Sequence, residues 1–363
     1  MSKLSIVAIV LVSGLVLSCF SAYYTHSLYL ECFKENSQLS ASYEAAQRKI
    51  SQLEADNNRL DERLGDLNDS YLAVNQSYFD FETGLVIASH RSNTWQLGFE
   101  CGADGWHIIT NSGDNWFIYN TGQTIPDQVT IMPEVVDHMY DVQAAYPDST
   151  AVGNWVSFQK ENPVYTRNIY LLGRYSGGAF TEIRQLAFLN VNDSTYRFFY
   201  KEQTGITDTI TLIKNDSANF VYFSFDLHQQ VNMEPDKTRY DLVFGPYYDK
   251  ATLFGMTIPY QVGGALLNCW QTEAALDSSR AFDEINYALL PGYTFINQRD
   301  IPGYRWKGVT VDVSGGGSAT YAVKVHYNYI FHTAQDNYYK LKFLSYTLNG
   351  NSGFPQFEFR QLE

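Results

Sequence analysis

The chain has 363 residues, enough to bury one large core or two medium ones, and 16% of them are aromatic. Tyrosine and phenylalanine favour strands, and the short apolar runs separated by Gly, Asn, Asp and Ser predict a β-rich fold. The formal charge of −14 at pH 7 argues against a nucleic-acid partner, which needs a basic surface.

The N-terminal residues predict export. An apolar run over residues 4–12 follows the single early charge of Lys3, as in a signal peptide. It leads to Val16-Leu17-Ser18-Cys19, which resembles a bacterial lipobox, in which cleavage falls before the cysteine and the thiol carries the lipid. We therefore expect a signal peptide over residues 1–18, lipidation at Cys19 and a tether over residues 19–35. An uncleaved membrane anchor and a plain secretion signal are the alternatives.

A heptad repeat over residues 36–75 predicts an α-helical coiled-coil stalk. Apolar residues recur with alternating gaps of three and four, with leucines at successive d positions and one asparagine at an a position. This pattern is typical of a parallel homodimer, in which the buried asparagine fixes the register. A single long helix packed on its own domain is the alternative. The predicted oligomerisation residues are Ile50, Leu53, Asn57, Leu60, Leu64 and Leu67.

Residues 76–363 return to a period of two and contain similar stretches twice. The segment 95–99 (Trp-Gln-Leu-Gly-Phe) is echoed by 240–244 (Tyr-Asp-Leu-Val-Phe), and both alternate as half-buried strands do. Further pairs, such as those ending in Trp155 and Trp306, follow in the same order at a nearly constant offset. Collinear landmarks favour two tandem β units, over residues 76–215 and 216–363. These units would form two domains or one continuous core.

Other segments carry local predictions. Residues 133–145 and 281–290 are more helical in pattern than their surroundings, and one strand is expected over residues 321–331. Cys101 and Cys269 would link the two units if bridged, with Cys32 left to pair between chains, or they would be buried and unpaired. Asp300, next to Arg299, suits a solvated surface position.

The C-terminal segments 338–346 and 353–359 resemble the signature of the HmuY-like lipoproteins of Bacteroidota. Residues 95–99 and 240–244 are similar to that family's W-D-x-x-F strand; Asp241 matches its aspartate, whereas the first copy has Gln96. The resemblance implies an all-β, mainly antiparallel lipoprotein with two tandem HmuY-like β units, anchored in the outer membrane and exposed at the cell surface. The N-terminal coiled-coil stalk departs from the family pattern.

The resemblance also implies a ligand and a partner. The founding member of the family binds haem and passes it to a TonB-dependent transporter. We therefore expect haem as a cofactor, and a TonB-dependent receptor or another outer-membrane protein as a partner. Haem iron is held by histidine or methionine side chains in an apolar slot. The candidate ligands are His107, His138, Met139 and Met132, although each alone more commonly has a structural or surface role.

No enzyme signature occurs in the sequence, such as G-x-S-x-G, H-E-x-x-H or a Walker loop, and no metal-ligand spacing is present. We therefore expect a binding protein and no enzyme. The alternative function is a non-catalytic structural lipoprotein that oligomerises through its stalk and docks on an outer-membrane assembly or an extracellular ligand. A hydrolase is a distant third.

Overall fold

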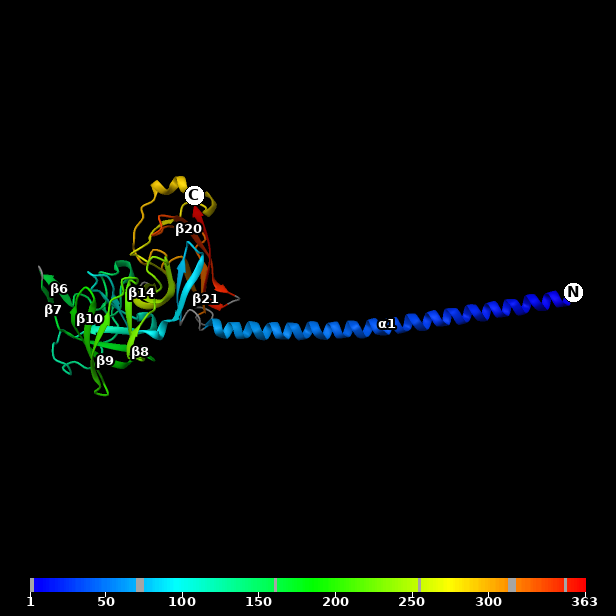
Figure 1. The fold of residues 1–363 in the computed structure, drawn as a ribbon, viewed down its shortest axis with the longest axis horizontal. Helices are drawn as coiled ribbons and strands as arrows, with labels where there is room; N and C mark the ends of the chain where they lie inside the picture. Colours follow the sequence, from blue (N-terminus) through cyan, green and yellow to red (C-terminus); the bar gives the residue numbers. More distant parts are fainter. Residues whose placement is uncertain (1–2, 70–74, 160–161, 254–255, 313–317, 349–350) are drawn as a thin grey trace. The chain divides into compact units, whose positions relative to one another are not determined.

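The computed structural model describes residues 3–69, 75–159, 162–253, 256–312, 318–348 and 351–363. They fall into two compact units, Met1–Gly65 and Asp66–Glu363. The first unit contains most of helix α1, and the second contains the antiparallel β-sheets (Figure 1). The predicted class, mainly antiparallel β with an N-terminal helix, is confirmed.

Helix α1 runs without a break from Lys3 to Asp69 (Figure 1). This range contains no proline, so every residue keeps the backbone donor that an α-helix needs. The helix includes the predicted tether over residues 19–35. Its described range ends at Asp69, and Asn75, the last residue of the predicted stalk, begins strand β1. Of the helices that the structure describes, none is long and apolar enough to cross a membrane.

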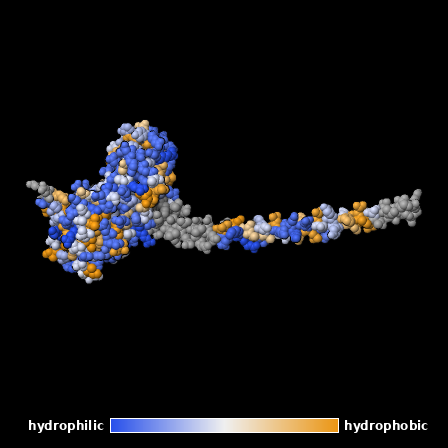
Figure 2. Space-filling view, in the orientation of Figure 1, coloured by the Kyte–Doolittle hydropathy of each residue, from blue (hydrophilic) through white to orange (hydrophobic). Residues whose placement is uncertain are grey.

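Apolar side chains are exposed along α1, where Figure 2 shows hydrophobic residues interspersed with polar ones. Leu39, Tyr43, Ile50 and Leu53, all at a or d positions of the predicted heptads, are more than half exposed in the single chain. The predicted contact residues Asn57, Leu60, Leu64 and Leu67 lie outside the residues whose side chains the structure describes. Self-association of the helix stays a prediction.

Two four-stranded antiparallel sheets combine strands from both predicted units. Their strand orders are β15-β14-β1-β2 and β13-β12-β3-β4. Hairpin β1–β2 therefore lies against β14, and hairpin β12–β13 lies against β3. The bounds are β1 (Asn75–Asp80), β2 (Leu85–Arg91), β3 (Leu97–Glu100), β4 (Ile108–Thr110), β12 (Phe220–Ser224), β13 (Gln229–Val231), β14 (Leu242–Leu253) and β15 (Met256–Leu267).

These two sheets have corresponding registers. In each, an aromatic strand pairs with the echoed Leu-x-Phe strand of the other predicted unit. The pairs are Phe79–Leu242 and Tyr78–Val243 in one sheet, and Phe223–Leu97 and Tyr222–Gly98 in the other. Strands on either side of the predicted boundary at 215/216 thus share sheets.

The remaining strands form two outer sheets and two hairpins, β6–β7 and β17–β18. The sheets have the orders β11-β10-β9-β8-β5 and β16-β19-β20-β21. The bounds are β5 (Trp116–Asn120), β6 (Val156–Gln159), β7 (Asn162–Tyr165), β8 (Ile169–Ser176), β9 (Ala179–Val191), β10 (Thr195–Glu202), β11 (Thr207–Ile213), β16 (Glu273–Asp277), β17 (Lys307–Asp312), β18 (Ser318–Val323), β19 (Asn328–His332), β20 (Tyr338–Leu348) and β21 (Asn351–Leu362).

Of three local predictions, two are confirmed in part and one was wrong. The segments 133–145 and 281–290 are helical only as short 3₁₀ helices, because runs of this length do not repay the cost of nucleating an α-helix. The strand predicted over residues 321–331 is split into β18 and β19. A turn separates them, in which the Tyr327 N–H donates to the Lys324 carbonyl over 2.9 Å.

The core of the β unit is aromatic. Trp155 is buried in one large cluster and stacks on Tyr165, with ring centroids 5.7 Å apart. Trp306 is buried in a second cluster and stacks on Phe343, with centroids 3.9 Å apart. Such ring pairs stabilise the core beyond the burial of their apolar surface, because the rings prefer defined relative orientations.

The exposure of individual side chains decides the predictions for the two cysteines and for Asp300. Cys101 and Cys269 are both buried and unbridged, which is the second of the two alternatives. Asp300 is only 2% exposed, so the predicted solvated position is wrong. Its Oδ2 lies 3.3 Å from Nη2 of Arg305, an ion pair that compensates part of the cost of burying the carboxylate.

Candidate functional site

A groove of about 560 Å³ lies beside Met132 on the β unit. Loop residues 131–135, the hairpin between β8 and β9, and residues of β14 and β15 form its walls. Small-molecule sites commonly measure about 300–1,000 Å³, so the groove has the size of a ligand site. Its main apolar lining residues are Met132, Val135, Tyr175, Phe180, Ile183 and Tyr248.

A tight apolar cluster supports the groove from behind. Phe117 of β5, Met139, Tyr140 and Leu171 are fully buried there, and Met132 packs against them at the groove surface. The rings of Tyr248 and Phe180 meet Phe117 edge-on, with centroid distances of 4.9 and 6.0 Å. Close packing of this kind restricts the rotamers of the wall residues, so the groove is largely preformed.

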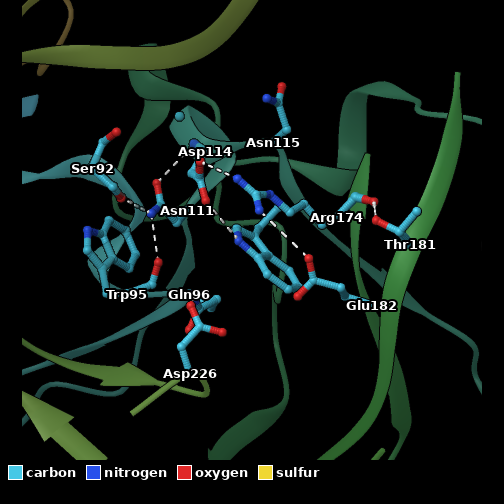
Figure 3. A network of polar contacts seen from close by, with 12 residues as sticks. Ser92, Trp95, Gln96, Asn111, Asp114, Asn115, Arg174, Thr181, Glu182 and Asp226 are labelled. Atoms are coloured by element: carbon cyan, nitrogen blue, oxygen red, sulfur yellow. Dashed lines mark hydrogen bonds and ion pairs between the residues drawn. The ribbon is translucent and has the colours of Figure 1, made fainter. Parts of the chain in front are cut away.

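Ion pairs hold the β8–β9 hairpin that carries one wall (Figure 3). Nη2 of Arg174 on β8 lies 2.9 Å from Oδ1 of Asp114, and Nη1 lies 3.7 Å from Oε1 of Glu182 on β9. Burial raises the pKa of Asp114, and Arg174 acts in the opposite direction. Because Arg174 and Glu182 flank the hairpin tip, these contacts position Tyr175 and Phe180 between them.

Asn115 connects this network to two walls of the groove. It follows the short turn Ser112–Asp114 and adopts a left-handed conformation with φ of 61°, which asparagine tolerates better than most residues. Its carbonyl accepts a hydrogen bond from the Tyr175 N–H over 2.9 Å. Its side-chain Oδ1 accepts one from the Tyr248 hydroxyl over 3.1 Å. One residue therefore orients both tyrosines.

Gly173 makes room for Met132. A Cβ atom at Gly173 would lie 3.3 Å from Cγ of Met132 and 3.1 Å from Cδ1 of Phe180. Both distances are shorter than ordinary carbon contacts, so a larger residue here would displace the groove lining. The glycine thus allows the methionine to pack directly on β8.

The structure brings three of the four sequence-predicted ligands to this region. Met132 lines the groove, and Met139 is fully buried in the cluster behind it. His138 is exposed, and its ring lies 6.5 Å from that of Tyr119, which packs on the same cluster. Met132 is therefore the predicted ligand with the most direct access to the groove.

His107 lies elsewhere, in a polar pair with Glu100. Its Nδ1 is 2.5 Å from Oε2 of Glu100, which also accepts hydrogen bonds from the backbone N–H groups of Trp106 and His107. Burial acts to raise the pKa of Glu100, but these bonds outweigh burial and lower it. A structural role for His107 follows from this pairing.

Sequence reasoning missed the aromatic walls. Tyr175 and Phe180 lie opposite each other across the β8–β9 hairpin, on either side of Ser176-Gly177-Gly178. A hairpin prediction around that turn would have paired them. Tyr248 comes from a distant strand, and no local signal in the sequence marks it as a neighbour of Met132.

The chemistry of the groove is that of a binding site. It combines ring faces, aliphatic side chains and one thioether, which suit a planar, mostly apolar ligand. Within the described ranges, no cluster of three or more His, Cys, Asp or Glu side chains could hold a metal ion.

Comparison with known proteins adds no further constraint. No family model matches the sequence, and no curated protein or solved structure matches the chain. The resemblance to the HmuY-like lipoproteins therefore stays a hypothesis, and the functional argument rests on the groove.

Proposed function

We propose that the protein is a cell-surface lipoprotein that binds haem or a related planar ligand for a TonB-dependent uptake system. The observation that carries this proposal is the aromatic groove with a methionine in its lining. Tyr175, Phe180 and Tyr248 offer rings against which a flat ligand can pack. Met132 offers a thioether, an established type of axial ligand to haem iron, and His138 is the nearest predicted imidazole.

Replacing Met132 with leucine should weaken haemin binding. Leucine keeps the volume and apolar character of the side chain, so the groove stays packed, but it cannot ligate iron. In a titration of the full chain followed through the Soret band, we expect saturable binding by the wild type at micromolar haemin. Met132→Leu should bind at least about tenfold more weakly and show an altered band.

Met233→Leu is the matched control. Met233 is equally buried but belongs to a different cluster, beside Trp95 and Tyr222. Its substitution should leave haemin binding unchanged. Absence of any Soret change with the wild type, or equal binding by Met132→Leu and wild type, would refute haem as the ligand of the groove.

The second candidate function is a structural lipoprotein that assembles through α1. The exposed residues Leu39, Tyr43, Ile50 and Leu53 favour it, because they recur at heptad positions and leave an apolar seam on an isolated helix. A parallel dimer would bury this seam. The proposed partner is a second copy of the chain, and the assembly docks on other outer-membrane proteins.

Replacing Ile50 with glutamate should convert the dimer to a monomer. The substitution introduces two carboxylates at one a layer of the coiled coil, where they would be buried next to each other. Sedimentation equilibrium of the full chain in detergent measures the mass. Ser51→Glu, on the outer face of the same turn, should remain dimeric. A wild-type monomer at all concentrations would rule out the coiled coil.

The proposal retains a lipid anchor at Cys19 in the outer membrane. The lipobox-like segment Val16–Cys19 and the apolar run before it support the anchor. Mass spectrometry of the protein from a host with lipoprotein processing should find a lipidated N-terminal Cys19. An unmodified Cys19 within an intact chain would contradict it.

We also propose that residues 76–363 are two copies of one β unit that exchange their N-terminal hairpins. The matched registers of the two mixed sheets support this proposal. Asn111 follows β4 and Asn268 follows β15, and they support it too. The side-chain amide of each donates to two carbonyls in the segment before the echoed strand of its own predicted unit. Exchange of hairpins would join the copies into one cooperative folding unit.

A further inference from the structure

Arg299 is a half-buried cation that forms no ion pair with the described residues. Its guanidinium lies over the ring of Tyr146, with Cζ 4.1 Å from the ring centroid. Its Nε atom is enclosed and has no hydrogen-bond partner, and no ion pair to it is formed by the described residues. Burying a charge in this way is costly unless an anion compensates it.

A small cavity lies beside this guanidinium. It measures about 50 Å³ and is lined by residues from β4, the turn that follows it, the loop carrying Tyr146, and β14 and β15. Four further lining residues, each more than nine-tenths buried, have an enclosed polar atom without a partner. These atoms are Ser92 Oγ, Gln143 Oε1 and the hydroxyls of Tyr146 and Tyr247. Unsatisfied polar atoms are rare in native interiors, so their concentration here points to a polar occupant.

The nearby acids are already engaged. Asp141 accepts hydrogen bonds from the N–H groups of Thr110 and Ala151, over 3.0 and 2.9 Å. Glu234 accepts a hydrogen bond from the Tyr222 hydroxyl over 2.5 Å. It interacts with Arg299 electrostatically, without a direct contact. Neither carboxylate therefore serves as a contacting counter-ion for the guanidinium.

We propose that this cavity binds a small carboxylate, held by Arg299 and by the hydroxyls of Ser92 and Tyr146. A guanidinium and two hydroxyls supply the donors that a carboxylate accepts, and the cavity has room for a group of a few non-hydrogen atoms. The site is separate from the aromatic groove, so it does not depend on haem binding. Trp95 also lines the cavity and provides a spectroscopic reporter.

Formate and acetate are the probes for this site. The full chain is titrated with each at constant ionic strength set by chloride, while tryptophan fluorescence and the thermal midpoint are recorded. A ligand that binds only the folded state raises the midpoint with concentration. We expect a saturable fluorescence change and a rising midpoint for at least one of the two carboxylates. A wild-type response equal to that of chloride overturns the proposal.

Arg299→Met removes the charge and keeps much of the side-chain volume. Carboxylate affinity should fall at least about tenfold in this variant and in Tyr146→Phe, which deletes only the hydroxyl. Tyr146→Phe and Ser92→Ala keep the test decisive if Arg299→Met fails to fold. Equal affinity in all of these variants overturns the proposal.

Arg184→Met is the matched control. Arg184 also lies over aromatic rings, those of Trp116 and Phe225, but it has carboxylate partners in Glu182 and Glu202. Its substitution should leave carboxylate binding unchanged, and an equal loss of binding in this variant would overturn the assignment to Arg299. Phosphate is the size control, and binding of phosphate in preference to both carboxylates would overturn the assignment of the ligand class.

Discussion

Replacing Asp241 with asparagine should remove a loss of stability that the wild-type protein undergoes as the pH rises from about 4 to 6. Asp241 is only 3% exposed, and burial raises its pKa from 3.8 to about 6. Hydrogen bonds from the Phe81 N–H and the Thr272 hydroxyl, both 2.9 Å long, offset part of this effect.

The sign follows from proton binding. Between its unfolded and folded pKa values, Asp241 is protonated in the folded state and ionised in the unfolded state. The folded state therefore binds more protons, and the free energy of unfolding falls as the pH rises through this window. A shift of about two units corresponds to about 3 kcal/mol, fully expressed above the folded pKa of about 6.

An amide should be tolerated at this position because the chain already uses one in the corresponding place. Gln96 Oε1 accepts a hydrogen bond from the Phe225 N–H over 2.7 Å, as Asp241 accepts one from Phe81. Urea unfolding at a series of pH values measures the effect. Asp241→Asn should match the wild type near pH 4 and be more stable by about 1–3 kcal/mol at pH 8.

Asp277 provides a control of opposite sign. Burial acts to raise its pKa, but hydrogen bonds from Ser279, Tyr293 and Arg280 outweigh burial and lower it. Its contribution to stability is therefore present above the unfolded pKa and is lost as the pH falls. Asp277→Asn should destabilise the protein at neutral pH. If Asp241→Asn and the wild type share one pH profile, Asp241 is not the source of the effect.

The strands of the β unit were predictable from local pattern. The alternation in residues 95–99 and 240–244 predicts half-buried strands, and Leu97, Phe99, Leu242 and Phe244 are buried as expected. The residues between them are buried as well, so the prediction of a solvated opposite face was wrong. The partners of these strands were not predictable, because pairing depends on contacts between residues far apart in the chain. Each aromatic strand pairs with a strand of the other predicted unit, a choice that composition and period do not encode.

The groove shows the same limit. Met132 was a candidate because methionine ligates haem. Tyr248 comes from the distant strand β14, and its hydroxyl donates to Asn115. Arg299 has no motif at all, and its neighbour Asp300 was expected at the surface. Burial of charged residues arises from tertiary packing, which a local reading of the sequence does not contain.

Replacing Asn111 or Asn268 with alanine should lower the free energy of unfolding by about 2–3 kcal/mol, and the two losses should be similar. Nδ2 of Asn111 donates to the carbonyls of Ser92 and Trp95 over 2.5 and 2.7 Å. Nδ2 of Asn268 donates to the carbonyls of Lys237 and Tyr240, over 2.8 Å in each case.

Both asparagines bind the segment that leads into the echoed strand. The asparagines are 4% and 2% exposed, and alanine at either position leaves two carbonyls, at least one of them buried, without this donor. Each unpaired buried group costs about 1–3 kcal/mol, part of which is recovered if water enters. The same bonding made from two distant positions is expected if one ancestral unit was copied together with its turn.

Urea unfolding of Asn111→Ala and Asn268→Ala measures the two losses, with the m-value as a check that the same surface unfolds. Asn297→Ala, an exposed asparagine in a loop, should change stability by less than about 0.5 kcal/mol. A large loss at one position and none at the other would mean that only one asparagine supports its strand. Matched losses would show that the two asparagines stabilise their strands equally, as two copies of one β unit would predict.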